Sequence, residues 1–344
     1  MNVPQQSDAP PPHAQLVQMA MAHWVSHVVH AAAKLGIADH LAGGPQGAVA
    51  LAEATGTHAP SLYRLMRTLA SLGILEEDGS SRFALTPLGE ALKTGAPGAA
   101  RATILTVASE SWVQGFAQLP HSLATGESGF EKLFGMPIFD WLAQRPEEAS
   151  LFSETMVGIH GGEPPAVIAA YDFSGLGTIV DIGGATGDLL TTILQRYPNS
   201  QGVLYDLPHV VLDAPALIAA RGLTDRILIE SGSFFDDVPA GADAYLLSHI
   251  IHDWSEEQCL TILGHCRRAM HPGSRLLLIE MVLPAGNTPH PGKMLDMMML
   301  VGPGGQERTE PEYAALLAKA GLQLKRVVPT ASPVSVVEAR IAQV

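Results

Sequence analysis

The segment 252–255 (His-Asp-Trp-Ser) carries the residues of this sequence best suited to proton transfer. It follows an apolar stretch that is predicted to form a strand ending at Ser248, so it falls between a strand and a helix. Because the ordinary pKa of histidine is about 6.5, His252 could act as a general base. We expect His249 to face the other way and to have a structural role. The sequence offers these histidines no clear further ligands at ordinary spacing, so no metal site is expected.

A glycine-rich turn lies in segment 180–188 (Val-Asp-Ile-Gly-Gly-Ala-Thr-Gly-Asp). Glycines let a backbone approach a ligand closely, and this turn leads into a helix N-terminus with free N–H groups. The dinucleotide pattern G-x-G-x-x-G is not met, because Ala185 and Asp188 stand where it requires glycine. The phosphate-loop pattern fails too, since the turn lacks Gly-Lys-Ser/Thr. Two interpretations stay open here: a ligand-binding turn preceded by the acid Asp181, or a tight turn made for packing.

Polar residues also follow the second and third predicted strands. Asp206 lies 19 positions after Gly187, and a carboxylate at such a strand end can accept hydrogen bonds from both hydroxyls of a ribose. The alternative is that Asp206 caps the helix that begins near His209. After the third strand, the hydroxyl of Ser233 and the ring of Phe234 could bracket an adenine. Together with the glycine turn, these residues predict a nucleoside-containing ligand.

The elements that must position these residues begin at residue 179. Apolar strand candidates alternate there with helical segments, which predicts an α/β fold with a doubly wound, mostly parallel sheet. The strand candidates are 179–182, 202–205, 227–230, 244–248 and 276–280, followed by a final pair at 322–328 and 334–339. Ligands bind at the carboxyl ends of the strands in such sheets, which is where the acids and histidines fall.

The helix after the fourth strand has a clear beginning and a clear buried face. Ser255 and Gln258 have the spacing of a capping box. The apolar stripe of this helix consists of Cys259, Ile262, Leu263, Cys266 and Met270. The helix is therefore predicted to pack on the sheet and to hold the 252–255 segment at the mouth of the ligand crevice.

The N-terminal part predicts a smaller, mainly helical domain. Segment 13–41 is helical with little charge, so we expect it to be buried, plausibly between subunits. A short helix over 49–56, a second one from Ser61, and two strands at 72–77 and 82–86 form a winged-helix pattern. The favoured interpretation is dimerisation. A DNA-binding regulator is the alternative, although the second helix would offer a major groove only two arginines.

Composition limits the partners of the chain. It has 20 Lys and Arg against 34 Asp and Glu, a net charge of −14, which repels nucleic acid and favours small molecules or other subunits. No apolar run reaches the roughly 18 residues of a membrane span, and the N-terminus does not have the pattern of a signal peptide. The two cysteines are predicted to be reduced core residues of one helix, which suits a cytoplasmic protein.

Several of these segments resemble known methyltransferases. The glycine turn resembles motif I of S-adenosylmethionine (SAM) methyltransferases. Segment 252–255, with 271–274 (His-Pro-Gly-Ser), 277–280 (Leu-Leu-Ile-Glu) and 304–309 (Gly-Gly-Gln-Glu-Arg-Thr), resembles small-molecule O-methyltransferases of plant and bacterial natural-product pathways. The resemblance extends through the winged-helix domain and covers nearly the whole chain.

The resemblance implies a division of the chain into four parts. We expect a disordered tail over 1–12 and a winged-helix dimerisation domain over 13–97. A helical connector over 98–165 would contribute to the acceptor pocket, and a Rossmann-like, class I SAM-binding domain would occupy 166–344. The protein is then expected to be a homodimer that converts SAM to S-adenosylhomocysteine (SAH).

The resemblance also implies roles for individual residues. His252 would be the catalytic base, flanked by Glu280 and Glu307, whose carboxylates can orient the imidazole and stabilise the imidazolium. The cofactor-binding residues would be Asp181, Gly183, Gly184, Gly187, Asp206, Leu207, Ser233, Phe234 and Ser248. The acceptor-binding residues would be Phe152, Met156, Asp253, Met294 and Met298. Glu280 as a plain strand-end acid, Glu307 as a loop charge, and the methionines as ordinary core residues are the alternatives.

The predicted activity is SAM-dependent methylation of a phenolic hydroxyl on an aromatic or polyketide-like secondary metabolite, without a metal. A family member that binds SAM but does not methylate, such as a hydroxylase or decarboxylase, is the alternative within the family. Three positions depart from the family pattern. Plant members often have Asp at Ser233 and Lys at Ser248, and Ala185 replaces a glycine, which indicates a bacterial-type variant.

Overall fold

The computed structural model of the chain describes residues 10–342. The predicted tail over 1–12 therefore lies mostly outside the described residues, and the first helix begins at Pro12. The chain divides into two compact units. The first contains residues up to 113 together with 145–159, and the second contains 114–144 together with 160–344. The boundaries expected from the sequence stay predictions.

The first unit contains the predicted winged-helix elements. Its elements are α1 (Pro12–Lys34), α2 (Ile37–Leu41), β1 (Gln46–Gly47), α3 (Ala48–Thr55), α4 (Ala59–Ser71), β2 (Leu75–Glu77), β3 (Arg82–Leu85), α5 (Pro87–Glu90) and α6 (Ala100–Val107). The strands pair in the order β1-β3-β2, so the predicted hairpin gains a short third strand. Leu62, Met66 and Leu69 form the buried face of α4, as the helical spacing predicts.

Burial of the first helix within the chain is limited. Within the chain, only Ala32 and Ala33 of α1 are buried, whereas Leu16, Met19 and Trp24 are 68%, 70% and 56% exposed. The helix therefore has more apolar surface than its own unit covers, and burial of this segment between subunits stays a prediction. Its apolar residues are available for contact with another molecule.

The second unit is built on a seven-stranded sheet. Its elements in or beside the sheet are α12 (Glu163–Ala170), β4 (Thr178–Ile182), α13 (Asp188–Arg196), β5 (Gln201–Asp206), η1 (Val211–Asp213), α14 (Ala214–Ala220), β6 (Ile227–Ser231), β7 (Ala244–Ser248), η2 (Ile251–Asp253), α15 (Glu256–Ala269), β8 (Arg275–Glu280), α17 (Glu310–Lys319), β11 (Leu322–Pro329) and β12 (Ser335–Ile341). The strand order is β11-β12-β8-β7-β4-β5-β6. The five strands from β8 to β6 are parallel to one another, and β12 runs antiparallel to both of its neighbours, β8 and β11.

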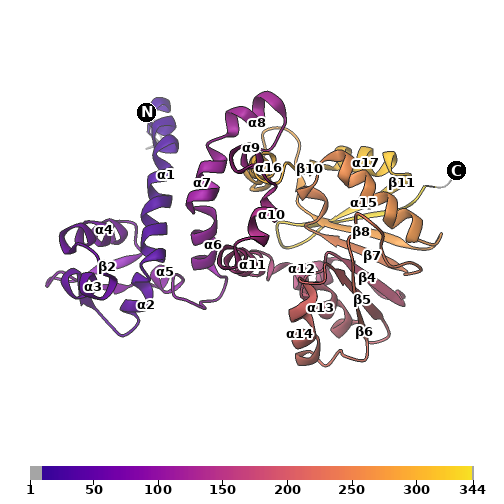
Figure 1. Cartoon of the computed structure of the whole chain (residues 1–344), viewed down its shortest axis with the longest axis horizontal. Coiled ribbons are helices and arrows are strands. Elements are labelled where there is room, and N and C mark those ends of the chain that lie inside the picture. The colour runs from indigo at the N-terminus through magenta and orange to yellow at the C-terminus, as the bar shows by residue number, and fades with distance from the viewer. Residues whose placement is uncertain (1–9, 343–344) are drawn as a thin grey trace, which may run out of the picture. The chain divides into compact units, whose positions relative to one another are not determined.

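Helices cover both faces of this sheet (Figure 1). Because side chains alternate along a strand, Val180 and Ile182 pack with α15 and α17 on one face, while Ile179 packs with α12, α13 and α14 on the other. The α/β prediction and all seven predicted strands are confirmed. The capping box of Ser255 and Gln258 is present as well.

Further helices and a small two-stranded sheet complete the second unit. They are α8 (Leu119–Thr125), α9 (Gly129–Phe134), α10 (Ile138–Ala143), α16 (Gly292–Val301), β9 (Val282–Leu283) and β10 (Arg308–Thr309), while α7 (Glu110–Phe116) and α11 (Pro146–His160) span the two units. The parallel pairing of β10 with β9 was not predicted. It brings the 304–309 segment next to the end of β8. Among the described helices, none combines the length and the hydropathy that a membrane crossing requires.

Candidate active site

The glycine turn after β4 is shaped by close packing. Gly183 has a φ of +69°, and its N–H donates to the carbonyl of Tyr205 at 2.8 Å. A Cβ on Gly184 would lie 2.6 Å from Cγ of Asp181, so only glycine fits beside this carboxyl group. Gly187 then becomes the N-cap of α13. Ala185 occupies the left-handed region with a φ of +50°, which is a strained position for a residue with a side chain.

Two buried acids support this turn. Asp206 accepts the N–H of Ala185 at 2.9 Å and that of Leu207 at 2.7 Å. Burial raises the pKa of Asp206, although these two hydrogen bonds act in the opposite direction. Burial and the charge of Asp206 raise the pKa of Asp181 to about 7. Because the N-cap of the following η1 is Val210, the alternative in which Asp206 caps a helix is wrong.

The remaining residues predicted on the cofactor side lie at the ends of neighbouring strands. A Cβ on Gly183 would be 3.6 Å from Cε1 of Phe234, so this ring borders the turn. The hydroxyl of Ser233 accepts the N–H of Phe235 at 3.2 Å. Leu207 is 40% exposed, and Ser248 is the last residue of β7. The structure thus brings a glycine turn, a carboxylate and an aromatic ring together at one edge of the sheet.

His252 belongs to η2, and its ring lies between the carboxylates of neighbouring residues. It is 6% exposed, while Glu280 and Glu307 are 0% and 1% exposed. Its Nδ1 is 2.7 Å from Oε1 of Glu307 and 3.8 Å from Oε2 of Glu280. On the other side of the ring, Nε2 is 3.6 Å from Oδ1 of Asp253. The three residues predicted as catalytic are therefore adjacent, with one ring nitrogen facing the two glutamates.

The charges around His252 outweigh the effect of its burial. Burial alone would lower the pKa of this histidine, but Glu280, Asp253 and Glu307 raise it to about 10. Burial raises the pKa of Glu280 to about 7, although the charge of His252 opposes this shift. A proton taken up by His252 is thus strongly stabilised by its acidic neighbours.

The backbone of the 304–309 segment wraps around η2. A Cβ on Gly305 would overlap the carbonyl oxygen of His252 and lie 2.6 Å from the carbonyl carbon of Asp253. The N–H of Gln306 donates to that carbonyl of His252 at 2.8 Å. The buried guanidinium of Arg308 donates to the carbonyl of Ile251 at 3.1 Å. These contacts fix Glu307, which lies between two of the contacting residues, against His252.

Three further hydrogen bonds hold the two glutamates, and the one to Glu307 comes from a residue that the sequence did not single out. Oε1 of Glu280 accepts the N–H groups of Ile250 and Ile251 at 3.2 and 2.9 Å. Oδ1 of Asp296, on α16, accepts the N–H of Glu307 at 2.9 Å. Asp296 stands within a run of methionines, and an acid among apolar residues was the one feature of the sequence that pointed to a role for it.

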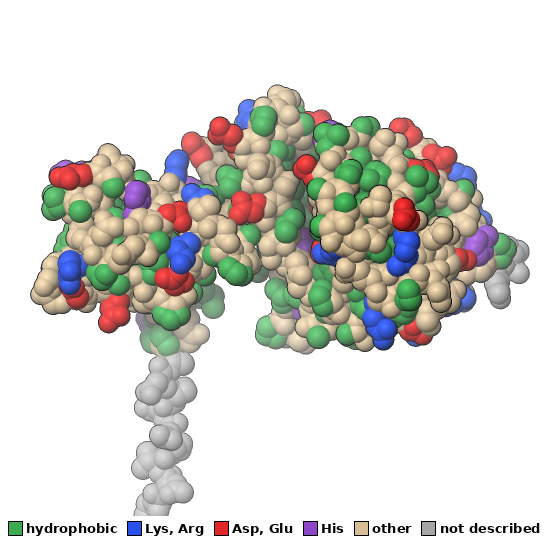
Figure 2. All heavy atoms as spheres, turned by 90° about the horizontal axis from the view of Figure 1, so that it is seen from below, with side chains coloured by type: hydrophobic (Ala, Val, Ile, Leu, Met, Phe, Trp, Pro, Cys, Tyr) green, Lys and Arg blue, Asp and Glu red, His purple; other side chains and the backbone are tan. Residues whose placement is uncertain are grey.

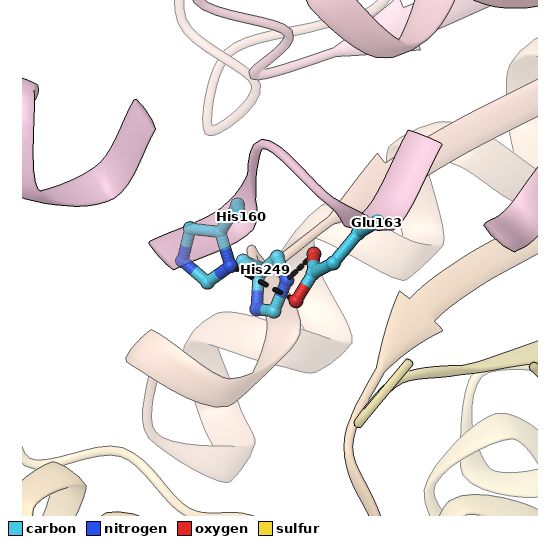
Figure 3. A group of neighbouring side chains, drawn as sticks. All are labelled: His160, Glu163 and His249. Atoms are coloured by element: carbon cyan, nitrogen blue, oxygen red, sulfur yellow. Dashed lines mark hydrogen bonds and ion pairs between the residues drawn. The ribbon is translucent and has the colours of Figure 1, made fainter. Parts of the chain in front are cut away.

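His249 was expected to face away from His252, but the two rings are neighbours. Its ring centroid is 5.3 Å from that of His252, and its Nε2 is 2.7 Å from Oε2 of Glu163. Glu163 also contacts Nδ1 of His160 at 3.1 Å, and Figure 3 shows both rings on this one carboxylate. Neither His160 nor Glu163 was singled out from the sequence, because they precede His249 by more than 80 positions.

The residues predicted to line the acceptor pocket lie in both units. In the first unit, Phe152 of α11 stacks on Trp112 with centroids 6.2 Å apart, and Met156 follows one turn later. In the second unit, α16 carries Met294, which is 69% exposed, and Met298, which is half-buried. Their common role in one pocket stays a prediction.

The chain matches two family models over most of its length. Residues 116–323 match an O-methyltransferase domain, and residues 17–95 match an O-methyltransferase dimerisation domain. Phenazine O-methyltransferase PhzM of Lysobacter antibioticus is 43% identical over 325 residues, which are 94% of this chain and 95% of that protein. The mitomycin biosynthesis 6-O-methyltransferase of Streptomyces lavendulae is 39% identical and aligns over 93% of this chain and 92% of its own length.

Solved structures agree with these matches. The crystal structure of LaPhzM has a TM-score of 0.90 and 42% identity, covering 96% of this chain and 100% of that one. The O-methyltransferase NcsB1, solved with SAM and 2-hydroxy-5-methyl naphthoic acid, has a TM-score of 0.83 and 34% identity, covering 92% and 96%. As the motifs around His252 and the glycine turn predicted, the chain belongs to the O-methyltransferase family and carries its N-terminal dimerisation domain.

Proposed function

We propose that this O-methyltransferase transfers the methyl group of SAM to a phenolic hydroxyl of an aromatic secondary metabolite, with His252 as the general base. The observation that carries the proposal is a buried histidine held by Glu280 and Glu307, two residues after Ile250, whose side chain packs against Gly183 of the glycine turn. The acceptors named for the relatives, among them a phenazine and 3-amino-4-hydroxybenzoate, support an aromatic acceptor.

The residues after β4, β5 and β6 fit SAM. Asp206 would accept hydrogen bonds from the ribose hydroxyls, because each of its oxygens has one backbone donor and a lone pair to spare. The ring of Phe234 and the exposed part of Leu207 would contact the adenine, and Ser233 and Ser248 would add polar contacts. Asp181 supports the turn through its contact with Gly184. Bound SAM supplies an electrophilic methyl group, and SAH is left after transfer.

The arrangement of His252 determines which nitrogen accepts the proton. Nδ1 carries a hydrogen that it donates to Glu307, so Nε2 is left as the basic nitrogen. Nε2 takes the proton of the acceptor hydroxyl, and the phenolate oxygen attacks the methyl carbon in line with the departing sulfur. Glu280 and Glu307 stabilise the imidazolium that forms. Much of the remaining rate gain comes from holding the reacting atoms in line, and the expectation that no metal takes part stays a prediction.

On the acceptor side, we propose contacts from α16, and the contacts expected from α11 stay predictions. Phe152, Met156, Met294 and Met298 offer ring and thioether surfaces, which pack well on a flat aromatic molecule. Asp253, 3.6 Å from Nε2 of His252, would contact a polar group of the acceptor near the reacting hydroxyl. These assignments support a flat aromatic acceptor.

A transfer assay tests this function. With methyl-labelled SAM and a panel of aromatic phenols such as 3-amino-4-hydroxybenzoate, we expect label to enter at least one acceptor as an O-methyl group. The variant Asp206→Ala should lower the affinity for SAM at least tenfold, because two ribose hydrogen bonds are lost, each to a charged group and worth about 1.5–3 kcal/mol. Unchanged SAM affinity in this variant would contradict the assignment of Asp206.

The same assay distinguishes the alternatives. Aclacinomycin 10-hydroxylase RdmB of Streptomyces purpurascens is 34% identical over 298 residues, so a hydroxylated product without incorporated label would favour a non-methylating member. Label found on nitrogen would favour N-methylation, as in the name of an N,N-dimethyltransferase relative. Specific DNA binding at moderate salt, without methyl transfer, would favour a regulator.

The pH profile of Glu307→Gln tests the role of the glutamates. His252 must be deprotonated to act as a base, and its pKa of about 10 means that kcat/KM should rise with pH from neutrality into the alkaline range. Glu307 is one of the carboxylates that raise this pKa, so Glu307→Gln lowers it and moves the rise to lower pH. The amide oxygen can still accept the Nδ1 hydrogen.

The control for this profile is Glu257→Gln, which neutralises an exposed acid in the first turn of α15. It should leave the profile unchanged. A profile of Glu307→Gln that stays in place or moves to higher pH would contradict the electrostatic role of Glu307.

We also infer that the protein is a homodimer joined through the first unit. The exposed apolar residues of α1, including Leu16, Met19 and Trp24, together with the matched dimerisation domain, support this. Sedimentation of the full chain should give twice the chain mass of 36.3 kDa, and Trp24→Glu should shift the protein toward the monomer. Leu212→Glu, at a 72% exposed residue of the second unit, is the matched control. A monomer in the unmodified protein would contradict the inference.

The surface and the thiols support small-molecule partners and a cytoplasmic location. Lys and Arg side chains are scattered among acidic ones on the face drawn in Figure 2, without gathering into a basic stripe there. Cys259 and Cys266 are buried and free, which is compatible with a reducing compartment. We therefore expect no nucleic-acid partner.

A further inference from the structure

Three side chains beside the active site converge in a way that the methyl-transfer mechanism does not use. His160 ends α11, Glu163 begins α12, and His249 follows β7. Figure 3 shows the two imidazole rings and the carboxylate pointing toward one another. Oε1 of Glu163 is 3.1 Å from Nδ1 of His160, and Oε2 is 2.7 Å from Nε2 of His249. The two rings lie against each other with centroids 3.8 Å apart.

The chemistry of this set is that of a transition-metal site. Two imidazole nitrogens and one carboxylate are the ligands of many zinc sites, with bond lengths of about 2.0–2.2 Å. One ligand atom from each residue lies within 4.8 Å of the other two. Two ligand atoms on one tetrahedral ion lie about 3.3 Å apart at these bond lengths, and the separations of 3.1 and 2.7 Å between Glu163 and the two rings are near this value.

An independent observation concerns the far side of His249. Its Nδ1 is buried and has no hydrogen-bond partner among the described residues, and the same is true of Oε2 of Glu280. His249 and Glu280 also bring ligand atoms within 4.8 Å of one another. A histidine that binds a metal through Nε2 carries its hydrogen on Nδ1 and donates it to a carboxylate or carbonyl. Glu280 supplies such an acceptor, so the two unpartnered atoms complement each other once the metal is bound.

We propose that His160, Glu163 and His249 bind one divalent transition-metal ion, with Zn²⁺ as the best-fitting ion. Two nitrogen ligands favour zinc, cobalt or nickel over magnesium and calcium, which prefer all-oxygen sites. Three protein ligands leave a fourth position for water or another small ligand. The side chain of His160, which is 24% exposed, provides access from solvent. The ion would lie beside the base but would take no part in proton transfer.

Zinc titration of the full chain tests the proposal, with His160→Ala as the main variant. We expect the unmodified protein to bind one more Zn²⁺ per chain than His160→Ala, and excess Mg²⁺ should not displace it. The difference is the informative quantity, because His23 and His27 on α1 have ring centroids 6.2 Å apart and can bind zinc as well. Cobalt chloride gives a second readout, since its visible spectrum reports nitrogen ligation and should change in the variant.

Two more variants make the test specific. His121→Ala removes a histidine whose Nε2 is 3.6 Å from Glu127 and which belongs to no three-ligand group among the described residues, so it should bind zinc like the unmodified protein. Glu163→Gln should weaken binding at least tenfold. Equal stoichiometry and affinity in the unmodified protein and His160→Ala would overturn the proposal, as would a lack of binding by the unmodified protein in excess zinc. Circular dichroism verifies that each variant is folded.

Discussion

The variant His252→Ala is expected to lower kcat by about 10²- to 10⁴-fold, the range for loss of a general base. The phenol loses the imidazole that Glu280 and Glu307 both contact, and a phenol with an ordinary pKa of about 10 is hardly ionised at neutral pH without it. The affinity for SAM should persist, because the glycine turn and Asp206 are unchanged. Turnover is measured with labelled SAM, and SAM affinity is measured by calorimetry.

Two comparisons make this result interpretable. His252→Gln keeps a side chain of similar length between the glutamates, so a similar loss in both variants assigns the effect to the missing base rather than to misfolding. His271→Ala removes another histidine that faces an acid, since its Nε2 is 3.3 Å from Asp243, and should keep normal activity. Near-normal turnover in His252→Ala would rule out His252 as the base.

The variant Gly305→Ala is expected to cost about 3 kcal/mol or more of stability and most of the activity. The added Cβ would overlap the carbonyl oxygen of His252 and lie 2.6 Å from the carbonyl carbon of Asp253. Both neighbours are backbone atoms, so no side chain can rotate away. Either the segment that carries Glu307 or η2 must move, and the hydrogen bond between Gln306 and His252 is lost. Thermal unfolding and kcat measure the two effects.

Gly264→Ala is the matched control for this variant. Gly264 lies within α15, and a Cβ there would meet only the end of the Arg268 side chain at 3.6 Å. Alanine is about 1 kcal/mol more favourable than glycine in a helix, so this variant should be as stable as the unmodified protein or more so. A Gly305→Ala protein with normal stability and activity would contradict the close packing of the 304–309 segment on η2.

The strands and the position of His252 after β7 could be predicted because their signals are local. Apolar runs bounded by polar or glycine-rich turns place each strand of the main sheet, and a parallel α/β sheet collects the carboxyl ends of its strands at one edge. Asp206, His252 and Glu280 each follow or end such a strand. Knowledge of the strand ends was therefore sufficient to predict that these residues lie at the same edge of the sheet.

The contacts that could not be predicted join segments far apart in the chain. The pairing of β10 with β9 involves two residues in each strand, too few for a recognisable pattern. Asp296 accepts the backbone N–H of Glu307, and no pattern of side chains predicts such a contact. His249 was expected to face away from His252, but the backbone turns at His249 with a φ of +53°, and the two ring centroids are 5.3 Å apart.

The position of Asp296 links the choice of acceptor to the rate of methyl transfer, two properties that protein engineers usually try to change separately. One helix, α16, carries Met294 and Met298, which are proposed to contact the acceptor, and between them the acid that holds the backbone of Glu307. Random diversification of this helix to broaden the acceptor range would frequently damage the catalytic machinery as well. Libraries that vary the methionines while keeping Asp296 fixed should retain far more active clones. Because Asp296 must be kept, natural changes in acceptor preference are expected at the positions on either side of it.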